Sequence, residues 1–213
     1  MKCRKEDLLL YAVTDRSWLK GETLCDQVEK ALAGGTTFVQ LREKNLDKVH
    51  LLEEARKIQA LCRRYKVPFV INDSVEIAAA IDADGVHLGQ KDMSVEEAGA
   101  RLGSDAIIGA SARTVEQALL AQEQGADYLG VGAVFQTGTK ADARTISHET
   151  LRAICAAVEI PVIAIGGISE ENVMELSGTG ICGIAVISAL FSKEDITKAA
   201  ETLKKMTKEA VNR

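Results

Sequence analysis

Residues 124–140 read QGADYLGVGAVFQTGTK and contain, in one stretch, a pattern that recurs along the whole chain. Gly125 follows a helical pattern, the β-rich run YLGVGAVF occupies 128–135, and polar residues follow from Gln136 to Lys140. Glycine is typical of the position just after a helix. The stretch therefore predicts a unit in which a helix leads into a buried strand and the strand ends in a polar loop.

β-rich runs of this kind occur at 8–13, 37–41, 67–71, 85–88, 106–110, 128–135, 161–165 and 183–187. Helical patterns lie between them, for example at 49–65 and 114–125, with apolar residues at i, i+3, i+4 and i+7. The strands lack strict alternation, which indicates a parallel sheet covered on both faces. Eight β/α units predict that residues 1–213 form one domain, an α/β fold of the (β/α)8 TIM barrel type. A doubly wound open sheet is the alternative.

Glycines at several joints between helices and strands are interpreted as helix C-caps. They lie in AGGTTFVQ (33–40), DADGVHL (82–88), QGADYLGV (124–131) and TGICGIAV (179–186). Pro68 and Pro161 stand at strand starts, where a missing N–H group is tolerated.

Composition argues against several functional classes. The net charge is -5 and the charges of both signs are interspersed, so we expect no nucleic-acid partner and no membrane-binding face. Apolar runs are short and broken by glycine, which predicts a cytoplasmic protein without a signal peptide or membrane span. Five scattered cysteines with no C-x-x-C pair indicate reduced, mostly packed thiols and no zinc site.

A barrel places its active site in the loops that follow strands, and these loops are polar here. They hold residues 40–44 after the second strand, 72–73 after the third, 89–92 after the fourth and 111–113 after the fifth. Residues 137–140, Gly166-Gly167 and Ser188 follow the last three strands. The sequence predicts one polar rim on which all of these residues meet.

Asp73 and Asp92 are the candidate metal ligands, because two carboxylates from neighbouring strand ends can hold Mg²⁺ while a substrate phosphate completes its coordination. Asp73 with Glu76 fits a helix capping box equally well. Ser94 with Glu97 already supplies a capping box for the helix after Asp92, so that helix does not need Asp92.

Cations on the same rim predict a diphosphate substrate. Arg42 and Lys44 share one face at a period of two, and Lys140 belongs to the same rim. Gly166-Gly167 and Ser188 predict a second phosphate site built from backbone N–H groups. No pair of nucleophile and base is evident, since His50, His87 and His148 fit packed or exposed positions. This suits a reaction in which a diphosphate leaves and a second substrate attacks.

Seven motifs in order resemble the thiamine phosphate synthase family: QLREK (40–44), ND (72–73), HLGQKD (87–92), GAS (109–111), TGTK (137–140), IGGI (165–168) and GIAVIS (183–188). The resemblance spans almost the whole chain. It implies a (β/α)8 barrel that uses Mg²⁺ to condense hydroxymethylpyrimidine diphosphate with a thiazole phosphate, releasing pyrophosphate. Whether the thiazole is plain or carboxylated stays open, and a homo-oligomer is compatible with the sequence.

The resemblance also implies roles for individual residues. Those expected to bind the pyrimidine diphosphate are Gln40, Leu41, Arg42, Glu43, Lys44, Asn72, Ser111 and Lys140, of which Arg42, Lys44, Ser111 and Lys140 are the expected catalytic residues. Those expected to bind the thiazole phosphate are Thr137, Gly138, Thr139, Gly167, Ile187 and Ser188, with Asp73 and Asp92 on Mg²⁺.

Two positions depart from the family pattern: Gln136 stands where proline is expected, and Arg113 where histidine is expected. A sibling thiazole tautomerase, an isomerase on the same fold, is the nearest alternative, but its histidine belongs in the segment that here reads Ser111-Ala112-Arg113. A non-catalytic sensor of phosphorylated metabolites is the other alternative. Loss of a metal or diphosphate residue would indicate it, and none is lost.

Overall fold

The computed structural model describes residues 2–137 and 145–212. Its centre is a closed barrel of parallel strands that pair in chain order, with β1 joined to β8. The strands are β1 Leu10–Val13, β2 Phe38–Leu41, β3 Phe69–Asn72, β4 Gly85–Leu88, β5 Ile107–Ala112, β6 Tyr128–Gly132, β7 Val162–Ile165 and β8 Gly183–Val186. The predicted barrel is confirmed, and the pairing of β1 with β8 excludes the open sheet.

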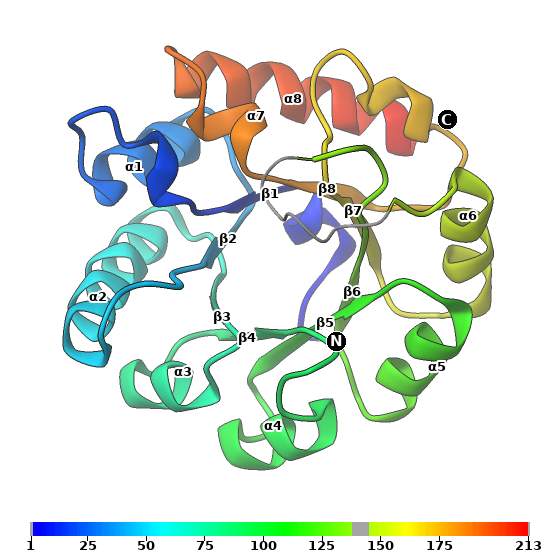
Figure 1. Cartoon of the computed structure of the whole chain (residues 1–213), viewed down its shortest axis with the longest axis horizontal. Coiled ribbons are helices and arrows are strands. Elements are labelled where there is room, and N and C mark those ends of the chain that lie inside the picture. The colour runs from blue at the N-terminus through cyan, green and yellow to red at the C-terminus, as the bar shows by residue number, and fades with distance from the viewer. Residues whose placement is uncertain (1, 138–144, 213) are drawn as a thin grey trace.

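Helices form a ring outside the barrel (Figure 1). They are α1 Leu24–Ala33, α2 Lys48–Tyr65, α3 Val75–Ile81, α4 Val95–Leu102, α5 Val115–Glu123, α6 His148–Ala157, α7 Ser188–Phe191 and α8 Ile196–Val211, with 3₁₀ helices η1 Lys5–Leu8, η2 Arg16–Trp18 and η3 Val173–Leu176. The expected alternation of strand and helix is confirmed, with the 3₁₀ helix η3 in place of an α-helix after β7. The long helix α8 packs against both η3 and α1.

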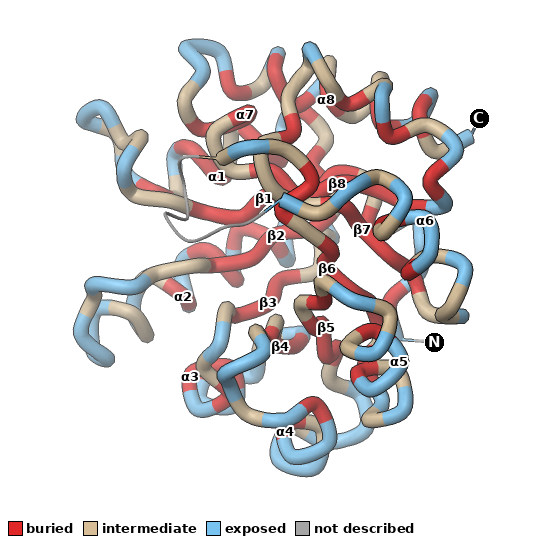
Figure 2. Tube along the Cα trace, turned by 45° about the vertical axis from the view of Figure 1, so that its right-hand side comes forward, coloured by how far each residue is buried: buried red, intermediate tan, exposed pale blue. Residues whose placement is uncertain are grey.

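Successive residues of each strand face opposite sides of the barrel wall, as the period of two requires. Tyr11, Phe38, Val70, Ile107, Tyr128 and Ile163 belong to an inner cluster, together with Val13 and Ala185. Their neighbours in sequence, such as Ala12, Val39 and Leu129, belong to the outer cluster that packs with the helices. Figure 2 shows the strands buried, whereas helices such as α3, α4 and α5 carry exposed residues on their outer sides.

The longer helices begin in a common way, with a Ser, Thr or Asp side chain that accepts a hydrogen bond from a backbone N–H of the first turn. These N-caps are Thr23, Asp47, Ser74, Ser94, Thr114, Ser147 and Asp195. Such a cap satisfies a donor that the helix itself cannot pair and contributes about 1 kcal/mol. The caps thus fix where each strand-to-helix loop ends and the helix starts.

Two of the glycines that we interpreted as helix C-caps have another role. Gly85 and Gly183 are the first residues of β4 and β8, and α3 ends instead at Asp82, whose φ is 52°. A Cβ atom on Gly85 would lie 1.8 Å from the carbonyl oxygen of Ile107, and one on Gly183 would lie 2.0 Å from that of Leu8. These glycines therefore allow close backbone approach at the amino ends of the strands.

The amino end of the barrel is closed by the first residues of the chain. Cys3 and Leu8 are fully buried members of the inner cluster. Lys2 Nζ donates to the carbonyl oxygen of Ala106 at 2.9 Å and lies 3.5 Å from Asp127 Oδ2. All five cysteines are free, in agreement with the predicted reduced thiols.

None of the helices in the described part of the chain combines the length and the apolar character needed to cross a membrane.

Candidate functional site

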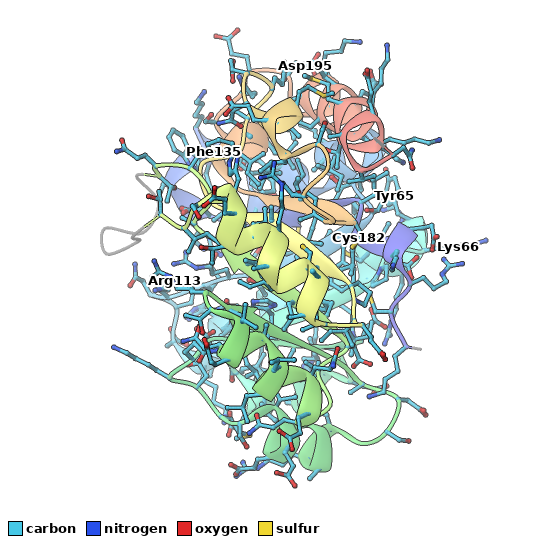
Figure 3. All side chains as sticks on the ribbon, turned by 90° about the vertical axis from the view of Figure 1, so that its right-hand side faces the viewer. Tyr65, Lys66, Arg113, Phe135, Cys182 and Asp195 are labelled. Carbon is cyan, nitrogen blue, oxygen red and sulfur yellow. The ribbon has the colours of Figure 1, made fainter. Side chains whose placement is uncertain are left out.

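A pocket of about 830 Å³ opens at the carboxyl ends of the strands. Residues that follow each of the strands β1 to β8 line its walls, and inward-facing strand residues form its floor. Figure 3 views the molecule from the side: Arg113 and Phe135, which follow β5 and β6, lie at one side. Tyr65, Lys66 and Cys182, which precede β3 and β8, lie at the opposite side. The pocket and the predicted polar rim are therefore the same end of the barrel.

Most of the predicted site residues line this pocket: Gln40, Arg42, Glu43, Lys44, Asn72, Asp73, Asp92, Ser111, Thr137, Gly167, Ile187 and Ser188. Leu41 does not, because its side chain faces the other side of the barrel wall and is buried in the outer cluster. Of Leu41, only the backbone is therefore placed to take part in the predicted binding of the diphosphate. Gly138, Thr139 and Lys140 lie outside the described residues.

The two aspartates sit in the pocket without capping the helices that follow them. Ser74, not Asp73, is the N-cap of α3, and its Oγ accepts from the N–H of Ile77. The capping alternative for Asp73 is therefore wrong. Asp73 has a φ of 63°, a conformation that Asp and Asn adopt more readily than other side chains. Asp92 Oδ2 accepts from the N–H of Gly89 at 2.7 Å, which folds the β4 loop back on itself.

The loops that carry the cations Arg42 and Arg113 are fixed by hydrogen bonds from their backbone N–H groups. The backbone N–H of Arg42 donates to the buried Thr14 Oγ1 at 2.9 Å, which ties the end of β2 to that of β1. The N–H of Arg113 donates to Gln117 Oε1 at 2.8 Å, at the start of α5. Arg42, Lys44 and Arg113 all line the pocket, so the departure at position 113 adds a cation to it.

The carboxylate of Glu43, a predicted site residue, pairs with a protein cation. Glu43 Oε1 lies 2.9 Å from Arg16 Nε, and the Glu43 side chain is only 4% exposed. The same guanidinium donates to Glu54 Oε2 at 2.8 Å. Burial raises the pKa of Glu43, and the nearby Arg16 opposes that rise. The sequence reasoning missed Arg16, which also lines the pocket.

The loops after β7 and β8 supply backbone to the pocket. Gly166 and Gly167 have φ values of 98° and 68°, which a residue with a side chain adopts only with strain. A Cβ atom on Gly167 would lie 2.3 Å from the carbonyl oxygen of Gln136. Gly167 is thus required for contact with the loop after β6. A bulky substitution there would displace that loop as well as obstruct the pocket.

Five polar side chains form a hydrogen-bonded chain at the bottom of the pocket: Tyr11, Gln40, His87 and Ser111 line it, and the buried Tyr128 lies beneath them. Gln40 Nε2 donates to Tyr11 Oη at 2.7 Å, and Tyr11 Oη lies 2.8 Å from Tyr128 Oη. His87 Nδ1 lies 3.0 Å from Tyr128 Oη, and His87 Nε2 lies 3.0 Å from Ser111 Oγ. The sequence predicted Gln40 and Ser111 as site residues and His87 as packed, but missed both tyrosines. Their inward register could have been read from β1 and β6 once a barrel was assumed.

The potential metal ligands are few. Within residues 2–137 and 145–212, no group of three or more His, Cys, Asp or Glu side chains is gathered so that it could hold a metal ion. Asp73 and Asp92 share the pocket as carboxylates, with the amide of Asn72 beside them on the same lining. This donor set is made of oxygen and suits Mg²⁺, which is usually bound through one or two carboxylates together with substrate phosphates and water.

Comparisons with known proteins agree on one family. A family model described as Thiamine monophosphate synthase matches residues 10–190. The thiamine-phosphate synthase of Clostridium tetani is 52% identical over 197 residues, which cover 92% of this chain and 94% of that protein. That of Ruminiclostridium cellulolyticum is 48% identical over 199 residues, which cover 93% and 95%. The solved structure of thiamine phosphate pyrophosphorylase from Pyrococcus furiosus matches with a TM-score of 0.89 at 45% identity, over 97% of this chain and 98% of that one.

Proposed function

Since the chain belongs to the thiamine monophosphate synthase family, and is therefore a transferase that acts on small molecules, we propose that its pocket condenses hydroxymethylpyrimidine diphosphate with thiazole phosphate. The bond between the pyrimidine methylene carbon and the diphosphate oxygen breaks, and its electron pair leaves with pyrophosphate. The lone pair of the thiazole nitrogen forms the new carbon–nitrogen bond, which gives thiamine phosphate.

One observation carries the proposal: a single pocket is lined by the carboxylates Asp73 and Asp92 together with the cations Arg42, Lys44 and Arg113. Cations directed at a departing diphosphate stabilise the charge that develops on its oxygens. Carboxylates beside those cations would repel a diphosphate unless a divalent cation lay between them. The combination therefore supports a diphosphate leaving group accompanied by a metal ion.

Mg²⁺ is the ion that these residues would hold, with Asp73 and Asp92 as its protein ligands. When bound, it supplies positive charge that neutralises the leaving diphosphate. Asn72 offers an amide to the same end of the pocket, and Lys140, which the structure does not describe, is assigned to the diphosphate by its motif alone.

The two substrates would occupy separate subsites of the pocket. Arg42, Lys44 and Ser111 would bind the pyrimidine diphosphate, with Gln40 below them on the floor. Thr137, Gly167, Ile187 and Ser188 would bind the thiazole phosphate. The backbone N–H groups at the start of a helix lack partners within it, so the start of α7 at Ser188 suits a phosphate.

The remaining residues prepare the site. Glu43 would act by holding Arg16 against the pocket wall, because a buried carboxylate at the diphosphate itself would repel it. Ile163, Ile165 and Ala185 form an apolar wall that keeps water away from the reactive methylene carbon. The reaction requires no protein nucleophile, since the thiazole nitrogen attacks.

The direct test is to incubate the protein with both substrates and Mg²⁺ and to measure thiamine phosphate and pyrophosphate. Formation of both products in equal amounts is the expected result. Isomerisation of the thiazole alone would indicate the tautomerase, and binding without turnover would indicate the sensor. Either result would overturn the proposal.

Lys140→Ala tests the part of the diphosphate subsite that the structure does not describe. We expect weaker binding of the pyrimidine diphosphate and lower turnover, because a cation that faces the diphosphate would be lost. Lys205→Ala, which removes an exposed lysine of α8, is the matched control. Equal kinetics for the two variants would remove Lys140 from the subsite.

Other features of the protein remain proposals. That residues 1–213 form one domain is supported by the pairing of β1 with β8 near the two ends of the chain. A cytoplasmic location and a homo-oligomer remain predictions from the sequence.

A further inference from the structure

At and beneath the floor of the pocket lie two buried tyrosines and a histidine whose chemistry the proposed reaction does not use. Tyr11 comes from β1, Tyr128 from β6 and His87 from β4, and they link Gln40 on β2 to Ser111 on β5. The chain of hydrogen bonds therefore crosses the interior of the barrel and ends at Ser111, a residue assigned to the diphosphate subsite.

The backbone leaves space for the middle of this chain. A Cβ atom on Gly109 would lie 2.4 Å from Tyr128 Oη, and one on Gly130 would lie 3.1 Å from His87 Cε1. In the barrel, Gly109 pairs with both His87 and Tyr128, and Gly130 pairs with Ser111. Side chains larger than glycine at these positions would push the two rings out of line.

One direction of the chain, starting at Gln40, gives the hydrogen of each tyrosine hydroxyl an acceptor within it. Gln40 Nε2 donates to the Tyr11 hydroxyl, and in this direction Tyr11 gives its single hydrogen to Tyr128. In the same direction Tyr128 gives its hydrogen to His87 Nδ1, which lies 3.0 Å from it and accepts when it carries no proton. Burial raises the pKa of both tyrosines, which keeps each phenol protonated and able to donate.

An imidazole that accepts at Nδ1 carries its hydrogen on Nε2 when it is neutral. His87 Nε2 then donates to Ser111 Oγ, which leaves the hydrogen of the Ser111 hydroxyl free to point at a ligand. The opposite direction would make Ser111 donate to the imidazole and present a lone pair to the pocket. Phosphate oxygens are acceptors, so only the first direction suits a diphosphate.

We propose that Tyr11, Tyr128 and His87 form a directional hydrogen-bond chain that holds His87 in its neutral Nε2–H form and makes Ser111 a donor to the substrate. Tyr128 and His87 are then positioning residues, because they act through Ser111 and not on the reacting atoms. The link to catalysis rests on the proposed function, whereas the tautomer of His87 does not.

The tautomer is tested by NMR on protein with ¹⁵N-labelled histidine, which has only three rings to resolve. The signals that disappear in His87→Asn belong to His87. Near pH 8 we expect a protonated Nε2 and an unprotonated Nδ1. A protonated Nδ1, with or without a proton on Nε2, would overturn the direction of the chain. This measurement needs no substrate and stands even if the condensation assay fails.

The link to Ser111 is tested by a double-mutant cycle with Tyr128→Phe and Ser111→Ala. Tyr128→Phe removes one hydroxyl and should lower kcat by roughly three- to tenfold with a smaller change in KM, the effect of one lost hydrogen bond. In the S111A background the same change should have little further effect. Equal losses in both backgrounds would mean that Tyr128 is only structural and would overturn the proposal.

Two further variants complete the experiment. Tyr65→Phe makes the same chemical change at the partly exposed end of α2 and should leave kcat unchanged. Tyr11→Phe leaves Tyr128 able to donate to His87, so its loss of kcat should be smaller than that of Tyr128→Phe. A larger loss in Tyr11→Phe would contradict the proposed order. If Tyr128→Phe folds poorly, the NMR measurement on the unsubstituted protein still decides the direction of the chain.

Discussion

The two ends of the barrel are built from the same strands, but the interior is filled at one end and open at the other. At the amino end, Cys3 and Leu8 fill the interior and are fully buried. At the carboxyl end, the interior opens into the pocket of about 830 Å³. The charges also differ in their partners: Lys2 lies near Asp127 within the protein, whereas Arg42 and Lys44 line the open pocket.

The difference shows that stability and catalysis are assigned to separate ends of each strand. At the amino end, a residue contributes to stability by filling the interior, because no substrate enters there. A residue at the carboxyl end leaves space for a substrate and holds charge toward it. Substitutions at the two ends should therefore change different measured quantities, and the following predictions test that separation.

The largest effect is expected for Asp92→Asn in the pocket. The amide oxygen can still accept from Gly89, so the free energy of unfolding should change by less than roughly 1 kcal/mol. The charge that Mg²⁺ requires is lost, and kcat should fall by on the order of 10²–10³. Steady-state kinetics and urea unfolding measure the two quantities. Asp105→Asn, the same change at an exposed position, is the control, and near-full activity of Asp92→Asn at limiting Mg²⁺ would remove Asp92 from the metal site.

Leu8→Ala should do the reverse at the amino end. Leu8 is fully buried, and removing most of its side chain should lower the free energy of unfolding by about 3 kcal/mol through lost burial and a cavity. At a temperature where the variant stays folded, kcat should be unchanged. Leu120→Ala on α5, where the side chain is 53% exposed, provides the matched control. A fall in kcat comparable to that of Asp92→Asn would break the separation of the two ends.

Ser74→Ala sharpens the comparison within a single loop, since Ser74 follows Asp73 directly. Loss of the N-cap of α3 should reduce the free energy of unfolding by about 1 kcal/mol, with little change in kcat. Asp73→Asn should instead reduce kcat with little loss of stability. Ser104→Ala at an exposed turn is the control for the cap. Equal effects of the two substitutions on kcat would mean that Asp73 acts only by shaping the loop.

Asp7→Asn should have the smallest effect, one visible only through its pH dependence. A side-chain hydrogen bond from Arg4 holds the pKa of Asp7 below its ordinary value of 3.8. The folded state therefore binds fewer protons than the unfolded state in this range, so the stabilisation is present above pH 3.8 and is lost as pH falls through the folded pKa. Urea unfolding should show wild type and variant differing slightly at pH 7 and converging in acid. A difference that grows in acid would contradict the assignment.

The sequence predicted the strands well because each lies between clear boundaries. The run at 85–88 became β4 unchanged, and Pro68 and Pro161 stand directly before β3 and β7. The strand predicted at 128–135 is longer than the observed β6, which ends at Gly132. Apolar residues continue past that point, so hydrophobicity alone gives no signal for the end of the strand. Between β7 and β8 the helical segment is the short 3₁₀ helix η3, which is too short to show an α-helical pattern of apolar residues.

The sequence predicted the site residues that directly follow strands. It missed those whose place in the site depends on contacts between segments distant in sequence. Asp73 and Asp92 follow their strands and line the pocket, as the barrel requires. Leu41 belonged to a predicted motif but faces outward, because only alternate residues of β2 can face the pocket. The pairing of Glu43 with Arg16 joins two loops that are distant in sequence, and residue pattern carries no trace of it.

The pairing of β1 with β8 also sets the order in which the barrel can form. Leu10 and Ile184 are register partners although almost the whole chain separates them. Such non-local contacts raise the contact order and slow folding, because the ring cannot close until the segment up to Val186 has left the ribosome. Until then β1 retains an open strand edge that another chain could occupy. The pairing of β8 with β1 therefore removes the open strand edge through which the growing chain could aggregate.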